Sequence, residues 1–123
     1  MTTPLPNASV RYLDTQLALS QIGDVEAMNG MLVMLQDTLT TDIPLIDDYL
    51  RQGDVVRANG LLHSLKGFIP IFSPPDLCAH VVRVEALSKD SQSTTVAPAF
   101  VELKPQLEKL LAEVRAHLLT VAS

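Results

Sequence analysis

Apolar residues recur at every third or fourth position through most of the chain, which is the period of an amphipathic α-helix. The most regular series predicts one long helix that starts after Asp24 and ends before Gln52. Its apolar members are Met28, Leu32, Leu35, Leu39, Ile43, Ile46 and Leu50. Pro44 lies inside this helix, and because proline has no N–H to bond the Thr40 carbonyl, we expect a kink near residues 40–44.

A shorter apolar series precedes the long helix. It predicts a short helix within residues 11–22, which Gly23 ends and which the capping residue Asp24 separates from the long helix. Residues 1–9 contain two prolines and have no periodicity, so we expect a flexible N-terminal arm there.

Three more helices are predicted after the long one. The connection Gln52-Gly53-Asp54 combines a glycine that ends one helix with an aspartate that caps the next, and it is short enough to require an antiparallel turn. The next helix is therefore expected from Asp54 to about Phe72.

A further boundary follows at residues 73–76, where Ser-Pro-Pro-Asp supplies a capping serine and a proline at the first helical position. The helix that begins there should reach about Lys89, followed by a polar loop from Asp90 to Thr95. Pro105 is expected to bend the last helix. The apolar seam of that helix consists of Phe100, Leu103, Leu107, Leu110, Val114 and Val121.

No segment shows the alternation with period two that a half-buried strand requires, so the predicted fold class is all-α. The short connections favour an antiparallel up-and-down four-helix bundle with a short extra N-terminal helix. Since a chain of 123 residues fills one core, residues 10–121 are assigned to a single bundle domain.

The composition excludes several classes of function. Lys and Arg number 9 against 14 Asp and Glu, and without a basic cluster the chain is not expected to bind nucleic acid. The single cysteine cannot form an internal disulfide, and no apolar run is long enough to span a membrane. The N-terminus lacks the features of a signal peptide, so we expect a cytoplasmic protein.

The helix expected from Asp54 to about Phe72 has an unusual outer face. With Leu65 at the centre of its apolar side, His63 lies about 160° away and points out of the core. Gly60 and Gly67 flank it, although each glycine inside a helix costs roughly 1 kcal/mol relative to alanine. An imidazole with no side chains on either side of it can be approached by another macromolecule, which suits a nucleophile or phosphate carrier. Lys66, one turn away, would neutralise phosphoryl oxygens. The alternative is an exposed histidine that lies by chance between two glycines.

The helix expected from residues 73–76 to about Lys89 carries an acidic residue on its inner side. Glu85 lies about 40° from the centre of the apolar stripe, and a buried carboxylate is costly unless a polar partner meets it. The antiparallel turn allows Glu85 to reach His63. A carboxylate that accepts from Nδ1–H would hold the ring in the tautomer whose Nε2 is free to attack. The alternative is a salt bridge from Glu85 to Lys66 or Arg83.

The segment Leu62-His63-Ser64-Leu65-Lys66-Gly67 resembles the H-x-[LI]-K-G core of histidine-containing phosphotransfer (HPt) domains, a family that includes the phosphoacceptor domains of chemotaxis kinases. The resemblance extends to the apolar residues Phe72 and Leu77, to Glu85 at 22 positions after the histidine, and to the helical layout of residues 11–121.

The resemblance implies a role for each residue of the motif. By this resemblance, His63 would be the phosphorylated residue, Lys66 a cation on the phosphate side, and Glu85 the partner that orients the ring. Gly67 would leave room for an incoming receiver domain.

The chain departs from the family pattern at two positions. Many members have a small residue seven positions after the histidine and glycine ten positions after it, where this chain has Pro70 and Ser73. Pro70 removes the backbone bond to the Lys66 carbonyl, so we expect a kinked helix and a reshaped docking surface.

The chemistry expected from the resemblance is a phosphoryl relay without independent kinase activity. The chain has no Gly-rich phosphate loop and no metal-ligand cluster, so we expect no cofactor and no metal site of its own, and Mg²⁺ supplied by the partner. The expected partners are a response-regulator receiver domain and a sensor or hybrid histidine kinase. The residues expected at the partner interface are Val56, Asn59, Gly60, Gly67 and Pro70.

A monomer suits such a carrier. Two alternatives stay open: a docking adaptor that binds a receiver or kinase without being phosphorylated, and the phosphoacceptor part of a longer chemotaxis-type kinase.

Overall fold

A computed structural model describes residues 11–122 of the chain. Within this range the chain is helical and contains no β-strand, which confirms the all-α prediction. The elements in chain order are α2 (Thr15–Ile22), α3 (Val25–Arg51), α4 (Val55–Phe68), the 3₁₀ helix η1 (Ile69–Ile71), α5 (Pro75–Asp90) and α6 (Ser93–Ala122). The arm expected at residues 1–9 lies outside the described residues.

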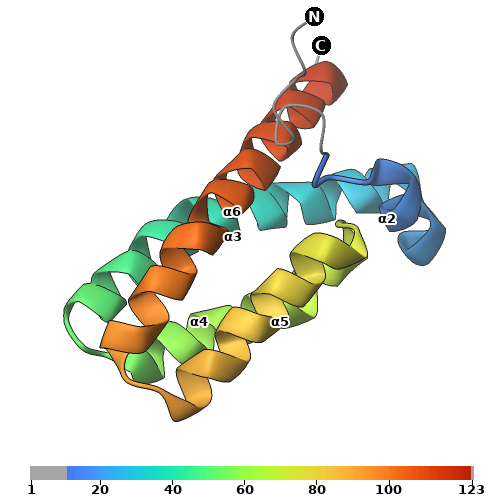
Figure 1. The fold of residues 1–123 in the computed structure, drawn as a ribbon. Coiled ribbons are helices and arrows are strands. Elements are labelled where there is room, and N and C mark those ends of the chain that lie inside the picture. The colour runs from blue at the N-terminus through green and yellow to red at the C-terminus, as the bar shows by residue number, and fades with distance from the viewer. Residues whose placement is uncertain (1–10, 123) are drawn as a thin grey trace, which may run out of the picture.

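The four longest helices each pack against two others. α3 contacts α4 and α6, and α5 contacts the same two helices (Figure 1). Their inner faces supply most of the buried core, including Phe100 and Leu32, and Phe72 adds a fully buried ring from the connection between η1 and α5. The apolar series read from the sequence for α3 is the buried face of that helix from Met28 to Leu50.

The short helix α2 is bonded to the rest of the fold at its start. Its N-cap, Asp14, accepts a bond from the Leu17 amide through its side chain, and its own backbone amide donates to the Phe72 carbonyl at 2.7 Å. Gly23 ends α2 with a left-handed φ of 85°, and Asp24 then caps α3, as the sequence predicts.

The α4 helix ends earlier than expected. It was predicted to reach about Phe72, but the α-helical bonding stops at Phe68 and residues Ile69–Ile71 form a 3₁₀ turn. Pro70 explains the change because it has no N–H to continue the α-helical ladder. The helix therefore tightens and ends where the sequence analysis expected a kink.

The start of α5 is also different. Ser73 was expected to cap it, but Pro74 occupies the N-cap position and makes no side-chain cap bond. The Ser73 hydroxyl is buried and has no hydrogen-bond partner among the described residues. With Ser73 as the cap, Pro75 would be the second helical residue, one of the two positions whose amide a capping serine bonds, and proline has no N–H to donate.

Two predictions about α6 were wrong. The polar loop expected over Asp90–Thr95 is much shorter, because the Gln92 carbonyl accepts from the amides of Thr95 and Val96 and starts the helix at Ser93. Val121 was placed on the buried seam, yet it is 48% exposed.

Among the described helices, none combines the length and the hydrophobicity that a membrane span requires.

Candidate functional site

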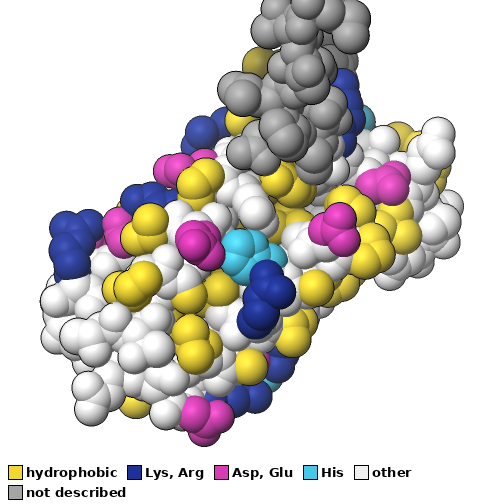
Figure 2. Space-filling model, viewed as in Figure 1, with side chains coloured by type: hydrophobic (Ala, Val, Ile, Leu, Met, Phe, Trp, Pro, Cys, Tyr) yellow, Lys and Arg dark blue, Asp and Glu magenta, His cyan; other side chains and the backbone are white. Residues whose placement is uncertain are grey.

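His63 lies on the outer side of α4, as the helical wheel predicts. Its side chain is 65% exposed, whereas Leu62 and Leu65 on either side of it along the chain are fully buried. Figure 2 shows a face of the molecule on which a histidine is open to solvent, beside a cationic side chain and among hydrophobic ones. The imidazole can therefore be reached from outside the fold.

The two glycines that flank the histidine have no internal packing role in the described structure. A Cβ atom built on Gly60 or on Gly67 would meet nothing within 4 Å. Neither residue has positive φ, a conformation that among the glycines is limited to Gly23 and Gly53. Neither packing nor backbone conformation therefore requires glycine at positions 60 and 67. The visible consequence of the two glycines is the open surface on both sides of the His63 imidazole.

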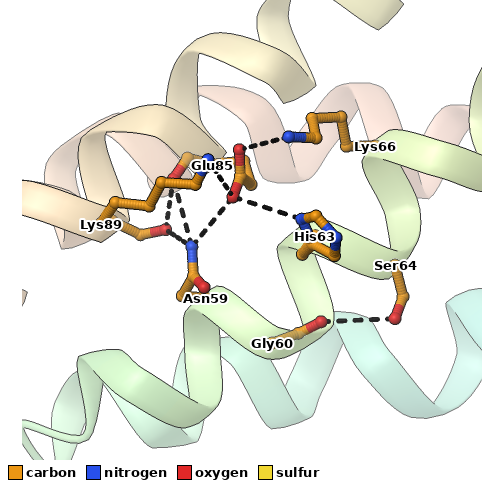
Figure 3. A network of polar contacts seen from close by, with 8 residues as sticks. Asn59, Gly60, His63, Ser64, Lys66, Glu85 and Lys89 are labelled. Carbon is orange, nitrogen blue, oxygen red and sulfur yellow. Dashed lines mark hydrogen bonds and ion pairs between the residues drawn. The ribbon is translucent and has the colours of Figure 1, made fainter.

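Glu85 comes from the neighbouring helix α5 and faces the same imidazole. It is 1% exposed, and its Oε2 lies 3.6 Å from Nδ1 of His63, an ion-pair separation slightly longer than a hydrogen bond. The second ring nitrogen, Nε2, is turned away from the carboxylate (Figure 3). Both the burial of Glu85 and its approach to His63 follow the sequence prediction.

Lys66 donates to the other oxygen of Glu85. The distance from Nζ to Oε1 is 2.9 Å, and the lysine side chain is 28% exposed. The salt bridge that was considered as an alternative partner for Glu85 thus exists together with the approach to His63, on separate oxygens. Arg83, the other candidate for that salt bridge, is exposed and forms no ion pair with any described residue.

Three further residues complete the network. The Asn59 amide nitrogen lies 3.1 Å from Oε2 of Glu85 and 2.8 Å from the Ser88 hydroxyl (Figure 3). Lys89 places its amine 3.5 Å from the same Oε2. Asn59 was expected at the partner interface, but its amide nitrogen points into the protein.

Lys89 and Ser88 belong to this site although neither is predicted there from the sequence. Lys89 follows Glu85 by four positions on one helix, and that spacing is the signal that could have found it. Ser88 carries no comparable signal, because its hydroxyl becomes a partner only when α4 and α5 pack together.

The charges around Glu85 favour its ionised form. Burial raises the pKa of the Glu85 carboxyl, but hydrogen bonds from Lys66 and Asn59 and the positive charges of Lys66 and Lys89 together outweigh it and hold the pKa below its usual value. The carboxylate is therefore negative at neutral pH and can stabilise positive charge on the imidazole.

The other residues predicted at the partner interface lie on α4 and on the 3₁₀ helix η1 that follows it. Val56, seven positions before His63, is 78% exposed, and Pro70, seven positions after it, is also exposed. The described residues contain no cluster of three or more His, Cys, Asp or Glu side chains that could hold a metal ion.

Compared with models of protein families, with curated proteins and with solved structures, the chain has no significant match in any of the three. Function is therefore inferred from the residues of the site.

Proposed function

We propose that this chain is a histidine phosphotransfer protein, in which His63 accepts and donates a phosphoryl group. It would pass that group between a kinase or receiver aspartate and a response-regulator receiver domain. The observation that carries the proposal is the combination of an open imidazole with a buried carboxylate on one of its two nitrogens: Nδ1 faces Glu85 and Nε2 faces outward.

In the transfer step the lone pair of Nε2 attacks the phosphorus of a receiver aspartyl phosphate. The N–P bond forms as the P–O bond to the aspartate breaks, and the aspartate leaves as a carboxylate. Nδ1 keeps its proton, so positive charge develops on the ring next to Glu85. The carboxylate stabilises that charge, and the reverse step regenerates the neutral imidazole.

The rest of the machinery would come from the partner. In-line phosphoryl transfer needs a metal ion and tight positioning, and we infer that Mg²⁺ belongs to the receiver or kinase. The open faces of Gly60 and Gly67 and the exposed Val56 and Pro70 fit a surface that admits a second domain.

The packing of α3 to α6 fits an antiparallel up-and-down four-helix bundle of the HPt type. We propose that this bundle acts as a cytoplasmic monomer. Its transient interface would be small, which suits a carrier that must release its partner.

The test is to incubate the protein with a phosphorylated receiver domain and Mg²⁺. The expected product carries an acid-labile, base-stable phosphate that is absent from His63→Gln. His80→Gln serves as a matched control, since His80 lies on α5 and its Nδ1 contacts Gln106 at 2.9 Å. Equal labelling of the wild type and His63→Gln would overturn the proposal. Undiminished receiver binding by His63→Gln, with no phosphohistidine in the wild type, would instead support a docking adaptor.

A further inference from the structure

Asn59 joins the helix that carries His63 to the helix that carries Glu85. It lies one turn before His63 on α4, and its amide nitrogen reaches three acceptors on α5. These are Oε2 of Glu85 at 3.1 Å, the Ser88 hydroxyl at 2.8 Å and the Glu85 carbonyl at 3.3 Å. The Ser88 hydroxyl in turn donates to the Glu85 carbonyl at 2.6 Å. The amide of Asn59 is therefore held on α5 from more than one side.

The oxygen that Asn59 contacts is the one that faces the imidazole. Lys66 holds Oε1, but a lysine side chain is long and flexible and can follow that oxygen when the carboxylate turns about its last carbon–carbon bond, where glutamate has only broad torsional preferences. A second donor on Oε2 restricts that rotation. Lys89 is a looser restraint, since it is 51% exposed and 3.5 Å away.

We propose that Asn59 is a positioning residue: it holds Oε2 of Glu85 against Nδ1 of His63 and so keeps Nε2 directed outward. Its effect on phosphoryl transfer rests on the proposed function, whereas its effect on the ring does not. The role differs from the interface role expected from the sequence. An interface residue changes the affinity for the partner, and a positioning residue changes the rate within the complex.

The first experiment measures the His63 ring in the unphosphorylated protein by ¹⁵N NMR. The wild type is expected to carry its proton on Nδ1, and Asn59→Ala is expected to shift the ring toward the mixture of tautomers of an unrestrained imidazole. Asn29→Ala is the matched control, because Asn29 is a half-buried asparagine whose Oδ1 lies 3.2 Å from Nε2 of His117 on another part of the fold. It should leave His63 unchanged.

Two further variants cover the case in which Asn59→Ala does not fold. Asn59→Leu keeps approximately the size of the side chain, adds no charge and loses the donor, and Ser88→Ala removes one of the groups that anchors the amide. Both should shift the tautomer in the same direction. A folded Asn59 variant with the wild-type tautomer would overturn the proposal.

The second experiment follows single-turnover transfer from a phosphorylated receiver at increasing receiver concentration. Asn59→Ala should lower the saturating rate constant by about tenfold, within the hundredfold that a misplacement of about 1 Å can cost, with the half-saturating concentration unchanged. Val56→Ala, at an exposed interface position, should instead raise the half-saturating concentration.

The outcomes separate the two proposals. A wild type that is never phosphorylated removes the proposed function, while the NMR result still decides the role of Asn59. A wild type that transfers, together with an Asn59→Ala variant that changes only the half-saturating concentration, overturns the positioning role.

Discussion

The amine of Lys66 lies 2.9 Å from Oε1 of Glu85, so the lysine expected to serve an incoming phosphate is already paired with a buried carboxylate. The pair has a structural consequence that can be measured apart from any phosphoryl transfer. Removing Lys66 takes the nearest positive charge away from a carboxylate that is 1% exposed.

Lys66→Met should therefore destabilise the fold by about 2 kcal/mol. This is less than the roughly 3–5 kcal/mol typical of a broken buried pair, because Asn59 and Lys89 still contact the carboxylate. Urea unfolding measures the change. Arg83→Met removes an exposed cation from α5 and should stay within about 0.5 kcal/mol of the wild type. Equal stability of the two variants would show that the Lys66 contact contributes nothing.

The stability contributed by Glu85 should depend on pH. Its folded-state pKa lies below the usual value of 4.5, so its contribution is complete above that pH and disappears as the pH falls through the lower, folded value. Glu85→Gln should be less stable than the wild type by about 2 kcal/mol at pH 7, with the difference shrinking below pH about 4. Urea unfolding between pH 3 and pH 7 tests this, and a difference independent of pH would contradict it.

The groups that face this carboxyl decide the sign of the effect. Lys66 and His63 approach it from α4 and Lys89 from its own helix, and no second carboxylate contacts it among the described residues. The carboxylate therefore meets attraction rather than repulsion on each side.

Under the proposed function, Gly67→Gln should block phosphoryl transfer while leaving the fold intact. A glutamine Cβ at this position meets nothing within 4 Å, and replacing an exposed helical glycine should raise stability by up to about 0.5 kcal/mol. Gly30→Gln is the matched control: Gly30 is also exposed, lies in α3 and has the same open surroundings. Transfer assays and thermal unfolding distinguish the outcomes. Normal transfer by Gly67→Gln, or loss of transfer in Gly30→Gln, would contradict a need for open surface beside His63.

Glu113 should hold the segment that leads into α2. Its carboxylate accepts from the backbone amides of Tyr12 and Leu13 at 3.1 Å each, about 100 residues away along the chain. Glu113→Ala should speed hydrogen exchange of these two amides and cost about 1.5–3 kcal/mol, as expected for hydrogen bonds to a charged acceptor. Glu102→Ala, at an exposed position of the same helix, is the control. Unchanged exchange at both amides would show that the apolar packing of these residues alone is sufficient.

Sequence periodicity predicted the features of the site that depend on direction. The 3.6-residue repeat places His63 outward and Glu85 inward, and both directions agree with their exposure. The bounds of α3 were also predicted closely, in this case from the residues at its ends. Asp24 caps the start of the helix, and the Gln52-Gly53 pair marks its end.

Features that depend on which residue of the same chain a side chain or amide contacts could not be predicted from periodicity. Asn59 lies on the flank of α4, and an angle on a wheel does not show whether a flank meets solvent or a neighbouring helix. Ser73 has the residue type of a cap, but the two prolines after it moved the helix start. In α6, bonds from two amides to the Gln92 carbonyl overrode the weak helix propensity of the Ser-Thr-Thr segment.

The empty surroundings of Gly60 and Gly67 imply that two properties can be selected separately: the stability of the fold and the access of a partner domain to His63. Both positions, and Gly30, could accept a side chain without a clash in the described structure. A library at these three sites, selected for heat resistance alone, should replace all three glycines. The same library selected for phosphoryl relay should replace only Gly30, so the difference between the two selected populations would show which glycines the partner needs.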